Sequence, residues 1–245
     1  MAWLLVDNSN TRTKFALGDA SGLLEWRGTI ATPEIGPETL AELLEGVAFE
    51  AVLIGSVVPA KRAILAAELG RRAPVHLLGP DSPLGLGIDY PNPAQIGADR
   101  LANAVGVIHR HHAPAIVIDF GTAVTFDVVD ASPAWIGGVI APGLGSMSEY
   151  LTRRTALLPV VELAEPPSAI GKSTVHAMQV GAVYGYRGLV KEILSKLLEE
   201  LPGDVAIIAT GGDAALIAAG VPEIQAVDAD ITLDGLRRVA VAVFG

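Results

Sequence analysis

The sequence predicts an α/β protein built from two similar domains, and three observations support this prediction. Short apolar runs alternate with segments of helical periodicity along all 245 residues. Runs such as Ala115–Ile118 are apolar on both faces, as in central strands that helices cover on both sides. The two halves also align at an offset of 112 residues, so that Asp7 falls on Asp119 and Thr13 on Thr125. We therefore expect domains at residues 1–114 and 115–245 that face each other across a cleft.

The first half begins with short strands and continues with helices and strands in alternation. Short apolar runs favour strands, whereas a proline in a first turn and leucines four residues apart favour helices. In chain order we expect strands at Ala2–Val6, Thr13–Leu17 and Leu23–Ile30, a helix at Pro37–Leu44, a strand at Ala51–Ile54, a helix at Ala60–Leu69, a strand at Val75–Leu78 and a helix at Ala98–His109. Glycines and prolines follow each other closely over Gly85–Ile96, which predicts a loop there.

The second half repeats this order. Its first strand is apolar and ends at an aspartate, as the first strand of the chain does. We expect strands at Ala115–Ile118, Thr122–Val129 and Trp135–Ile140, helices at Met147–Arg154 and Thr174–Leu201, a strand at Val205–Ala209 and helices at Ala214–Ala219 and Leu233–Val243. The repeated order supports two domains more firmly than any single boundary does.

Composition excludes several classes of function. Hydrophobic residues make up 51% of the chain and charged residues 18%, which excludes a disordered protein. The net charge of −10 argues against binding to nucleic-acid phosphates, and the absence of cysteine excludes disulfides and thiol nucleophiles. Mean hydropathy is high, at +0.46, yet glycine and proline interrupt the longest uncharged stretch, Ala131–Ser148. With no basic segment before Asp7, we expect a soluble, cytoplasmic protein.

Two polar turns follow predicted strands that end in aspartate. In Asp7–Lys14, hydroxyls and backbone N–H groups suit an anion, the carboxylate suits a hydrated cation, and Lys14 suits a phosphate. The alternative is an ordinary turn rich in Asn and Ser. In Asp119–Asp127, Gly121 lets a ligand approach the backbone, although the alternating threonines are also typical of a strand. A carboxylate at the end of a buried strand is costly without a partner or a function.

Two further motifs open predicted helices. Thr210-Gly211-Gly212 follows a strand and suits a nucleotide at a helix N-terminus, or forms only a tight turn. Neither the glycine-rich dinucleotide fingerprint nor the P-loop sequence is present. Asp99 and Arg100 lie in a first helical turn, where an acidic residue usually complements the helix dipole. Alternatively, Arg100 suits a substrate carboxylate, which it can bind in bidentate fashion.

A basic cluster ends one predicted helix. Its members are His109, Arg110, His111 and His112. The spacing of His109 and His112 allows a shared metal, but cationic residues also stabilise a helix C-terminus. We favour the second interpretation, because no cluster of histidines with acidic residues supports zinc.

The four motifs, in this order, resemble those of the type III pantothenate kinases. That family carries D-x-G-N-T-x-x-K, G-A-D-R, D-x-G-T-A-x-T-x-D and T-G-G, where this chain has DNSNTRTK, GADR, DFGTAVTFD and TGG. Further matches lie at Gly137–Leu144, Gly171–Thr174 and Leu233–Leu236, so the resemblance covers essentially the whole chain. Ser9 departs from the pattern, since the family usually has glycine there. If that position needs a positive φ, serine adds strain.

The resemblance implies two RNase-H-like domains of the acetate and sugar kinase, Hsp70 and actin superfamily, with ATP in an interdomain cleft. It implies ATP-dependent phosphorylation of pantothenate to 4′-phosphopantothenate, the first step of coenzyme A synthesis, by a homodimer that uses K⁺ or NH₄⁺. Asp99 is similar to the family's general base, and Asp119 to its ligand for the monovalent cation. The ATP-binding residues it implies are Asp7, Asn8, Ser9, Asn10, Thr11, Arg12, Thr13, Lys14 and Thr122. The pantothenate-binding residues it implies are Tyr90, Gly97, Ala98, Asp99, Arg100 and, contributed across the dimer, Thr174.

This scheme is physically coherent. Asp99 can act as a base near its ordinary pKa if it lies within hydrogen-bond reach of the hydroxyl. Lys14, Mg²⁺ and backbone amides would offset the triphosphate charge in a chain of net charge −10. Two alternatives remain open: a catalytically idle relative that binds nucleotide or pantothenate as a regulator, and a kinase or ATPase of the same fold with another substrate. The joint presence of Asp99, Lys14 and Asp119 favours the pantothenate kinase.

Overall fold

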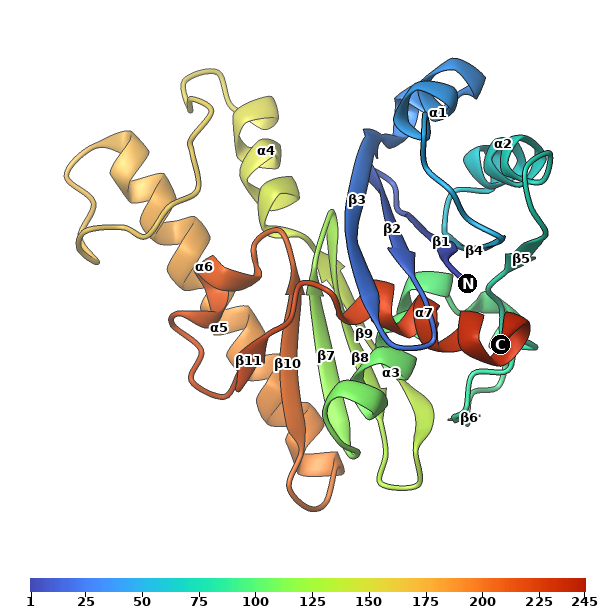
Figure 1. Cartoon of the computed structure of the whole chain (residues 1–245). Helices are drawn as coiled ribbons and strands as arrows, with labels where there is room; N and C mark the ends of the chain where they lie inside the picture. The colour runs from blue at the N-terminus through green and yellow to red at the C-terminus, as the bar shows by residue number, and fades with distance from the viewer. The chain divides into compact units, whose positions relative to one another are not determined.

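The computed structural model describes residues 1–245, the side chain of Ser148 excepted, and Figure 1 shows the elements along the chain. Packing divides the chain into two units. The first comprises Met1–His112, Ser132–Ile136 and Asp230–Gly245, and the second comprises Ala113–Ala131 and Gly137–Ala229. These units differ from the predicted domains 1–114 and 115–245, because the C-terminal helix and the tip of one hairpin pack with the first unit.

The first unit contains a five-stranded sheet in the order β3-β2-β1-β4-β5. Its strands are β1 (Trp3–Asn8), β2 (Arg12–Gly18), β3 (Leu23–Ala31), β4 (Ala51–Ser56) and β5 (Val75–Leu77). The first three strands are antiparallel neighbours, whereas β4 runs parallel to β1 and β5 parallel to β4. Parallel neighbours need crossover connections, which α1 (Pro37–Leu43) and α2 (Pro59–Leu69) supply.

Helices cover both faces of this first sheet, because alternate side chains of a strand point to opposite faces. The second pair of helices is α3 (Ala98–Arg110) and α7 (Ile231–Phe244), which pack against each other. Val6 of β1 joins a buried cluster with Leu40 of α1 and Leu65 of α2. Trp3 of β1 points to the opposite face of the sheet and packs against Phe244 of α7, with ring centroids 6.5 Å apart. Figure 1 shows α7, in red, beside these blue strands.

The second sheet repeats the arrangement of the first. Its strands are β6 (Gly87–Ile88), β7 (Ala115–Phe120), β8 (Ala123–Val129), β9 (Ala134–Pro142), β10 (Ala206–Gly211) and β11 (Ala226–Val227), in the order β11-β10-β7-β8-β9-β6. The β7–β8 pair is again antiparallel, and β10 is parallel to both β7 and β11. The bounds of β7 lie 112 positions after those of β1. The predicted α/β fold with a duplicated RNase-H-like arrangement is therefore confirmed.

The helices of the second unit follow its strands in the predicted order. They are α4 (Leu144–Arg154), α5 (Thr174–Glu200) and α6 (Ala214–Ala218). α4 begins three residues before the predicted Met147, since Gly143 is the extended residue that precedes its first turn. On α5, Tyr186 packs against Phe120 of β7 with ring centroids 6.3 Å apart.

The predicted loop Gly85–Ile96 is more ordered than its glycines and prolines indicated. It contains the short strand β6 (Gly87–Ile88) and the 3₁₀ turn η2 (Pro93–Gln95), and a second such turn, η1 (Thr32–Glu34), follows β3. β6 pairs with Ala134 and Trp135 at the start of β9. This pairing carries the residues after β6 to the side of Trp135. None of the described helices is long and apolar enough to span a bilayer.

Candidate active site

Buried polar side chains hold the β1–β2 turn from inside. Asn8 is 1% exposed and donates from Nδ2 to Oγ1 of Thr13 at 2.7 Å. Its Oδ1 accepts from Oγ of Ser56, at the end of β4, at 2.6 Å. Thr13 is fully buried and shares a hydrogen bond of 2.9 Å with Thr32. Asn8 and Thr13 therefore shape the turn and keep their side chains away from solvent.

Ser9 fits the position where the type III family usually has glycine. Among the described residues, Pro133 is the only non-glycine with a positive φ, so Ser9 carries no left-handed strain. The Ser9 hydroxyl donates to Oδ1 of Asp7 at 3.2 Å, and its carbonyl accepts from Oγ1 of Thr32 at 2.7 Å. The strain considered for this position is absent, and the hydroxyl adds a contact that glycine lacks.

The outward side chains of this turn are the ones that can meet a ligand. Asn10, Thr11 and Arg12 are exposed, and Lys14 is half-buried on β2, directly opposite the buried Asp7 of β1. The two cations, the amide and the hydroxyl are groups that bind phosphate oxygens. The turn thus separates a buried half that fixes the backbone from an exposed half that suits an anion.

Asp99 lies in the first helical turn of α3, and the segment after β4 links it to this turn. A Cβ placed on Gly97 would come within 2.5 Å of Oδ1 of Asp99 and 3.3 Å of Cγ1 of Val57. The backbone N–H of Val57 donates to the carbonyl of Asn8 at 3.1 Å. The segment after β4 therefore joins two of the predicted motifs within the first unit, and Gly97 leaves room for the Asp99 carboxylate.

Burial raises the pKa of the Asp99 carboxyl above its ordinary value. Arg100 lowers that pKa by a smaller amount, through a backbone N–H that donates to Oδ1 of Asp99 at 2.8 Å and through its charge. The pKa of Asp99 therefore lies above its ordinary value, because desolvation disfavours the carboxylate form. The shift makes this carboxylate a stronger proton acceptor, as a general base requires.

Arg100 and Tyr90 meet on one indole ring. The guanidinium carbon of Arg100 lies 4.9 Å from the ring centroid of Trp135. The Tyr90 ring approaches the same indole edge-on, with centroids 5.1 Å apart and planes at 69°. Trp135 was not among the predicted site residues, since its only signal in the sequence was an aromatic residue at the start of a predicted strand. The backbone N–H of Asp89 donates to the Trp135 carbonyl at 3.0 Å, which keeps Tyr90 beside the ring.

The second unit brings two further motifs together where β7 and β10 end. Their register pairs Thr210 with Asp119 and Gly211 with Phe120. Gly211 has a φ of 95°, and a Cβ there would lie 2.5 Å from the Phe120 carbonyl oxygen and 2.7 Å from Oδ1 of Asp119. Only glycine allows the T-G-G turn to pack this closely against Asp119. The next acid along the chain, Asp213, was not predicted; burial raises its pKa.

Hydrogen bonds from the start of α4 hold the β7–β8 turn. The carbonyl of Thr122 accepts from the backbone N–H of Gly143 at 3.1 Å and from Oγ of Ser146 at 2.9 Å. Thr122 is exposed, and Asp119 is half-buried at the end of β7. A carboxylate beside backbone carbonyls offers the oxygen ligands that hard cations prefer, so Asp119 fits the predicted cation ligand chemically. A cation here would need carbonyl or water ligands as well, because no group of three His, Asp or Glu suited to a metal occurs among the described residues.

The histidine cluster lies at the end of α3, as predicted. His109 and Arg110 occupy its last turn. Burial and then the charge of Arg238 lower the pKa of His109. This ring therefore tends to be neutral, and Arg110 carries the charge that complements the helix dipole.

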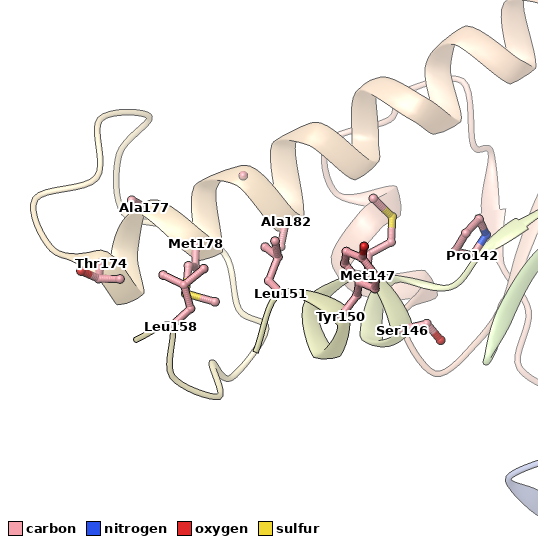
Figure 2. A pocket seen from close by; sticks show the side chains of 11 residues that line it. Pro142, Ser146, Met147, Tyr150, Leu151, Leu158, Thr174, Ala177, Met178 and Ala182 are labelled. Carbon is pink, nitrogen blue, oxygen red and sulfur yellow. The ribbon is translucent and has the colours of Figure 1, made fainter. Parts of the chain in front are cut away.

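Thr174 opens α5 and lines an apolar pocket of about 820 Å³ between α4 and α5. Figure 2 shows Met147, Tyr150 and Leu151 on the α4 side of this pocket, and Met178 on the α5 side. Tyr150 is 60% exposed and Leu151 42% exposed. Large apolar side chains exposed together in this way mark an interaction surface. Thr174 thus belongs to an apolar face of the second unit.

The chain matches a family model described as type III pantothenate kinase over residues 3–196. It is 57% identical to a type III pantothenate kinase of Akkermansia muciniphila over 98% of both chains. It is 43% identical to one of Methylacidiphilum infernorum, over 96% of this chain and 87% of the relative. A solved Sinorhizobium meliloti protein assigned as a 2-dehydro-3-deoxygalactonokinase shares the fold, with a TM-score of 0.66 and 15% identity over 99% of both chains.

Proposed function

Since the chain belongs to the type III pantothenate kinase family, we propose that it transfers the γ-phosphoryl group of ATP to the 4′-hydroxyl of pantothenate. The products are ADP and 4′-phosphopantothenate, and the reaction opens coenzyme A synthesis in the cytoplasm. One observation carries this proposal beyond family membership. A largely desolvated carboxylate, Asp99, lies beside a cationic side chain, and Val57 links its helical turn to the Asn8 carbonyl of a turn suited to phosphate.

Asp99 is the general base in this proposal. It accepts the proton of the 4′-hydroxyl as the oxygen attacks the γ-phosphorus, and the bond from that phosphorus to the β–γ bridging oxygen breaks. Its raised pKa favours this role, and its hydrogen bond from the Arg100 N–H holds the carboxylate in place. Arg100 binds the substrate carboxylate, and Tyr90, Gly97 and Ala98 complete the pocket wall.

The Asp7–Lys14 turn and Thr122 bind ATP in this proposal. Asn10, Thr11, Arg12 and Lys14 supply exposed donors, while the buried Asn8 and Thr13 keep the turn in shape. Phosphoryl transfer depends mainly on positioning and charge neutralisation, which such a turn provides without a P-loop. Asp7 is the carboxylate suited to hold hydrated Mg²⁺, which neutralises phosphate charge when bound with ATP. Asp119 is proposed as the ligand of K⁺ or NH₄⁺.

A homodimer is the last part of the proposal. The apolar face around the pocket of Figure 2 is suited to a second copy of the chain, and Thr174 lies on that face. Covering exposed side chains such as Tyr150 and Leu151 removes apolar area from water. Thr174 then contacts pantothenate bound to the partner subunit.

An idle regulatory relative is the second candidate. The residues required for turnover, Asp99, Lys14 and Asp119, are all present, which favours the enzyme. A kinase of the same fold with another small hydroxyl substrate is distinguished only by its substrate.

A coupled ADP-release assay tests the proposal. ADP is measured with ATP alone, with pantothenate, and with pantothenate plus Na⁺, K⁺ or NH₄⁺. We expect release that depends on pantothenate and is stimulated by K⁺ or NH₄⁺ but not by Na⁺. ADP release that pantothenate does not change would refute the kinase assignment. Pantothenate-dependent release with equal rates in all three salts would refute the monovalent-cation role of Asp119.

A further inference from the structure

We propose that Trp135 is a positioning residue of the substrate pocket, which orients the guanidinium of Arg100 toward the carboxylate of the substrate. The inference rests on the proposed function, because it assigns Arg100 to that carboxylate. Trp135 itself does not need to touch the reacting atoms. Neither the motifs nor the family pattern included it.

The first support for this proposal is the rigid placement of the indole. Trp135 is 1% exposed, so the surrounding protein holds its ring in one orientation. It lies at the start of β9, where Ile88 of β6 is its parallel partner. The backbone N–H of Asp89 donates to its carbonyl at 3.0 Å. The ring is therefore a fixed surface.

The second support is that both proposed substrate side chains of this region rest on that surface. Arg100 lies over the indole at 4.9 Å, and Tyr90 meets it edge-on at 5.1 Å. Arginine stacks on aromatic rings through the face of its guanidinium, whereas it binds carboxylates through N–H groups in its plane. The guanidinium of Arg100 can therefore stack on Trp135 and bind a carboxylate at the same time. The stacking fixes the guanidinium plane, and the hydrogen bonds to the carboxylate form in that plane.

The third support is the coupling of this surface to the base. The backbone N–H of Arg100 donates to Oδ1 of Asp99 at 2.8 Å, so the base and the carboxylate-binding group are consecutive residues of one helical turn. A substrate whose carboxylate is held by an oriented Arg100 also has its hydroxyl at a set distance from Asp99. Loss of the indole should therefore weaken binding of the substrate through its carboxylate and leave ATP binding unchanged.

The test compares Trp135→Phe, Trp135→Leu and the control Trp26→Leu. Trp26 lies on β3 and packs against the core of the first unit on another side, so its loss reports the general effect of removing an indole. Thermal unfolding identifies variants that remain folded. We expect Trp135→Leu to raise the KM for pantothenate about tenfold, in line with a desolvated cation–π contact, with an unchanged KM for ATP. Trp135→Phe, which keeps an aromatic face, should recover most of this loss, and Trp26→Leu should leave both constants unchanged.

A double-mutant cycle with Arg100→Lys shows whether Trp135 acts through Arg100. Lysine keeps the charge but lacks the planar group that stacks and binds in bidentate fashion. In the Arg100→Lys background, Trp135→Leu should add no further rise in the KM for pantothenate. The proposal would be overturned if Trp135→Leu raised the KM for pantothenate equally in the wild-type and Arg100→Lys backgrounds. It would also be overturned if Trp135→Leu weakened binding of panthenol, which lacks the carboxylate, as much as binding of pantothenate.

Failure of the proposed kinase function and failure of the positioning role of Trp135 give different results. A wild-type protein without pantothenate-dependent ADP release fails the proposed function itself. An active wild type in which Trp135→Leu leaves the KM for pantothenate unchanged fails only the positioning role.

Discussion

Asp99 shows how one side chain couples catalysis to stability. Its burial in the first turn of α3 raises its pKa, and the same desolvation costs folding free energy whenever the carboxyl is ionised. Gly97 makes that position accessible, since a Cβ there would lie 2.5 Å from the carboxylate oxygen. The proposed base is therefore held in a costly environment that suits proton transfer.

Replacing Asp99 by asparagine separates these two effects. The amide cannot accept the proton, so kcat should fall by about 10²–10⁴-fold. The amide oxygen can still accept from the Arg100 N–H, so the fold is kept. ATP affinity, measured by calorimetry, should match that of the wild type. A variant with full turnover would contradict the assignment of the base.

The stability of the same variant should depend on pH in a defined direction. A carboxyl with a raised folded-state pKa adds stability below its unfolded-state pKa and loses it as pH rises through the folded-state pKa. Asparagine has no such loss. Asp99→Asn should therefore be more stable than the wild type at neutral pH, and the difference should disappear at acidic pH. Denaturant titrations across this range measure it, and a variant that is less stable at neutral pH would contradict the burial argument.

The acidic limb of the activity profile belongs to the same residue. As the proposed base, Asp99 must be ionised for turnover, so kcat/KM for pantothenate should decline, as pH falls, at a pH above the ordinary carboxyl range. The expected profile has its acidic midpoint above the ordinary aspartate pKa of about 3.9. A rate that stays constant down to that value would exclude Asp99 as the titrating base.

Some site residues could be predicted from the sequence, and others could not. The Asp99–Arg100 pair could be predicted, because both residues lie within one short motif. Trp135 could not, because its contact with Arg100 depends on β6 pairing with β9, and a two-residue strand leaves no periodic pattern. The fit of Ser9 also required the structure, since the sequence does not specify the sign of its φ.

At the scale of elements, the duplicated strand order was readable from the sequence, whereas the position of the last helix was not. Strands that end in aspartate recur at a fixed offset, and in both sheets the first strand has an antiparallel neighbour on one side and two successive parallel strands on the other. α7 belongs to the first unit because it packs against α3. A Cβ on Gly235 of α7 would lie 1.9 Å from the Ala102 carbonyl oxygen of α3, so the two backbones approach closely.

A pair of glycine variants tests this close approach. Gly235→Ala should lower the free energy of unfolding by about 1–3 kcal/mol or more, because α3 and α7 must separate. Gly188→Ala on α5 is the matched control, since a Cβ there meets nothing within 4 Å. That change should stabilise the protein by about 0.5–1 kcal/mol, because alanine favours the helix. Urea unfolding measures both, and equal effects would contradict the packing of α7 on α3.

At the scale of the whole molecule, the proposed homodimer makes the apolar face between α4 and α5 a link between assembly and activity. Met178 lies within that face, so Met178→Glu would place an unpaired charge in the proposed dimer contact. We expect association to weaken about 100-fold or more, as seen by sedimentation. The KM for pantothenate should rise in parallel, because Thr174 no longer reaches the partner's site.

Ser195→Glu is the control for this variant. It adds the same charge at an exposed position of α5 that does not line the pocket. It should leave both association and activity unchanged. A Met178→Glu protein that sediments as the wild type does would place the dimer contact elsewhere.

Identification of the phosphorylated product shows whether this protein phosphorylates the 4′-hydroxyl of pantothenate. The protein is incubated with ATP and pantothenate, and the product is isolated and examined by mass spectrometry and by phosphorus–proton NMR. We expect one added phosphoryl group, with phosphorus coupled to the methylene protons of the primary 4′-carbon, and no such product from Asp99→Asn. Unmodified pantothenate after complete incubation of the folded wild-type protein, or phosphate on the secondary hydroxyl, would contradict this expectation.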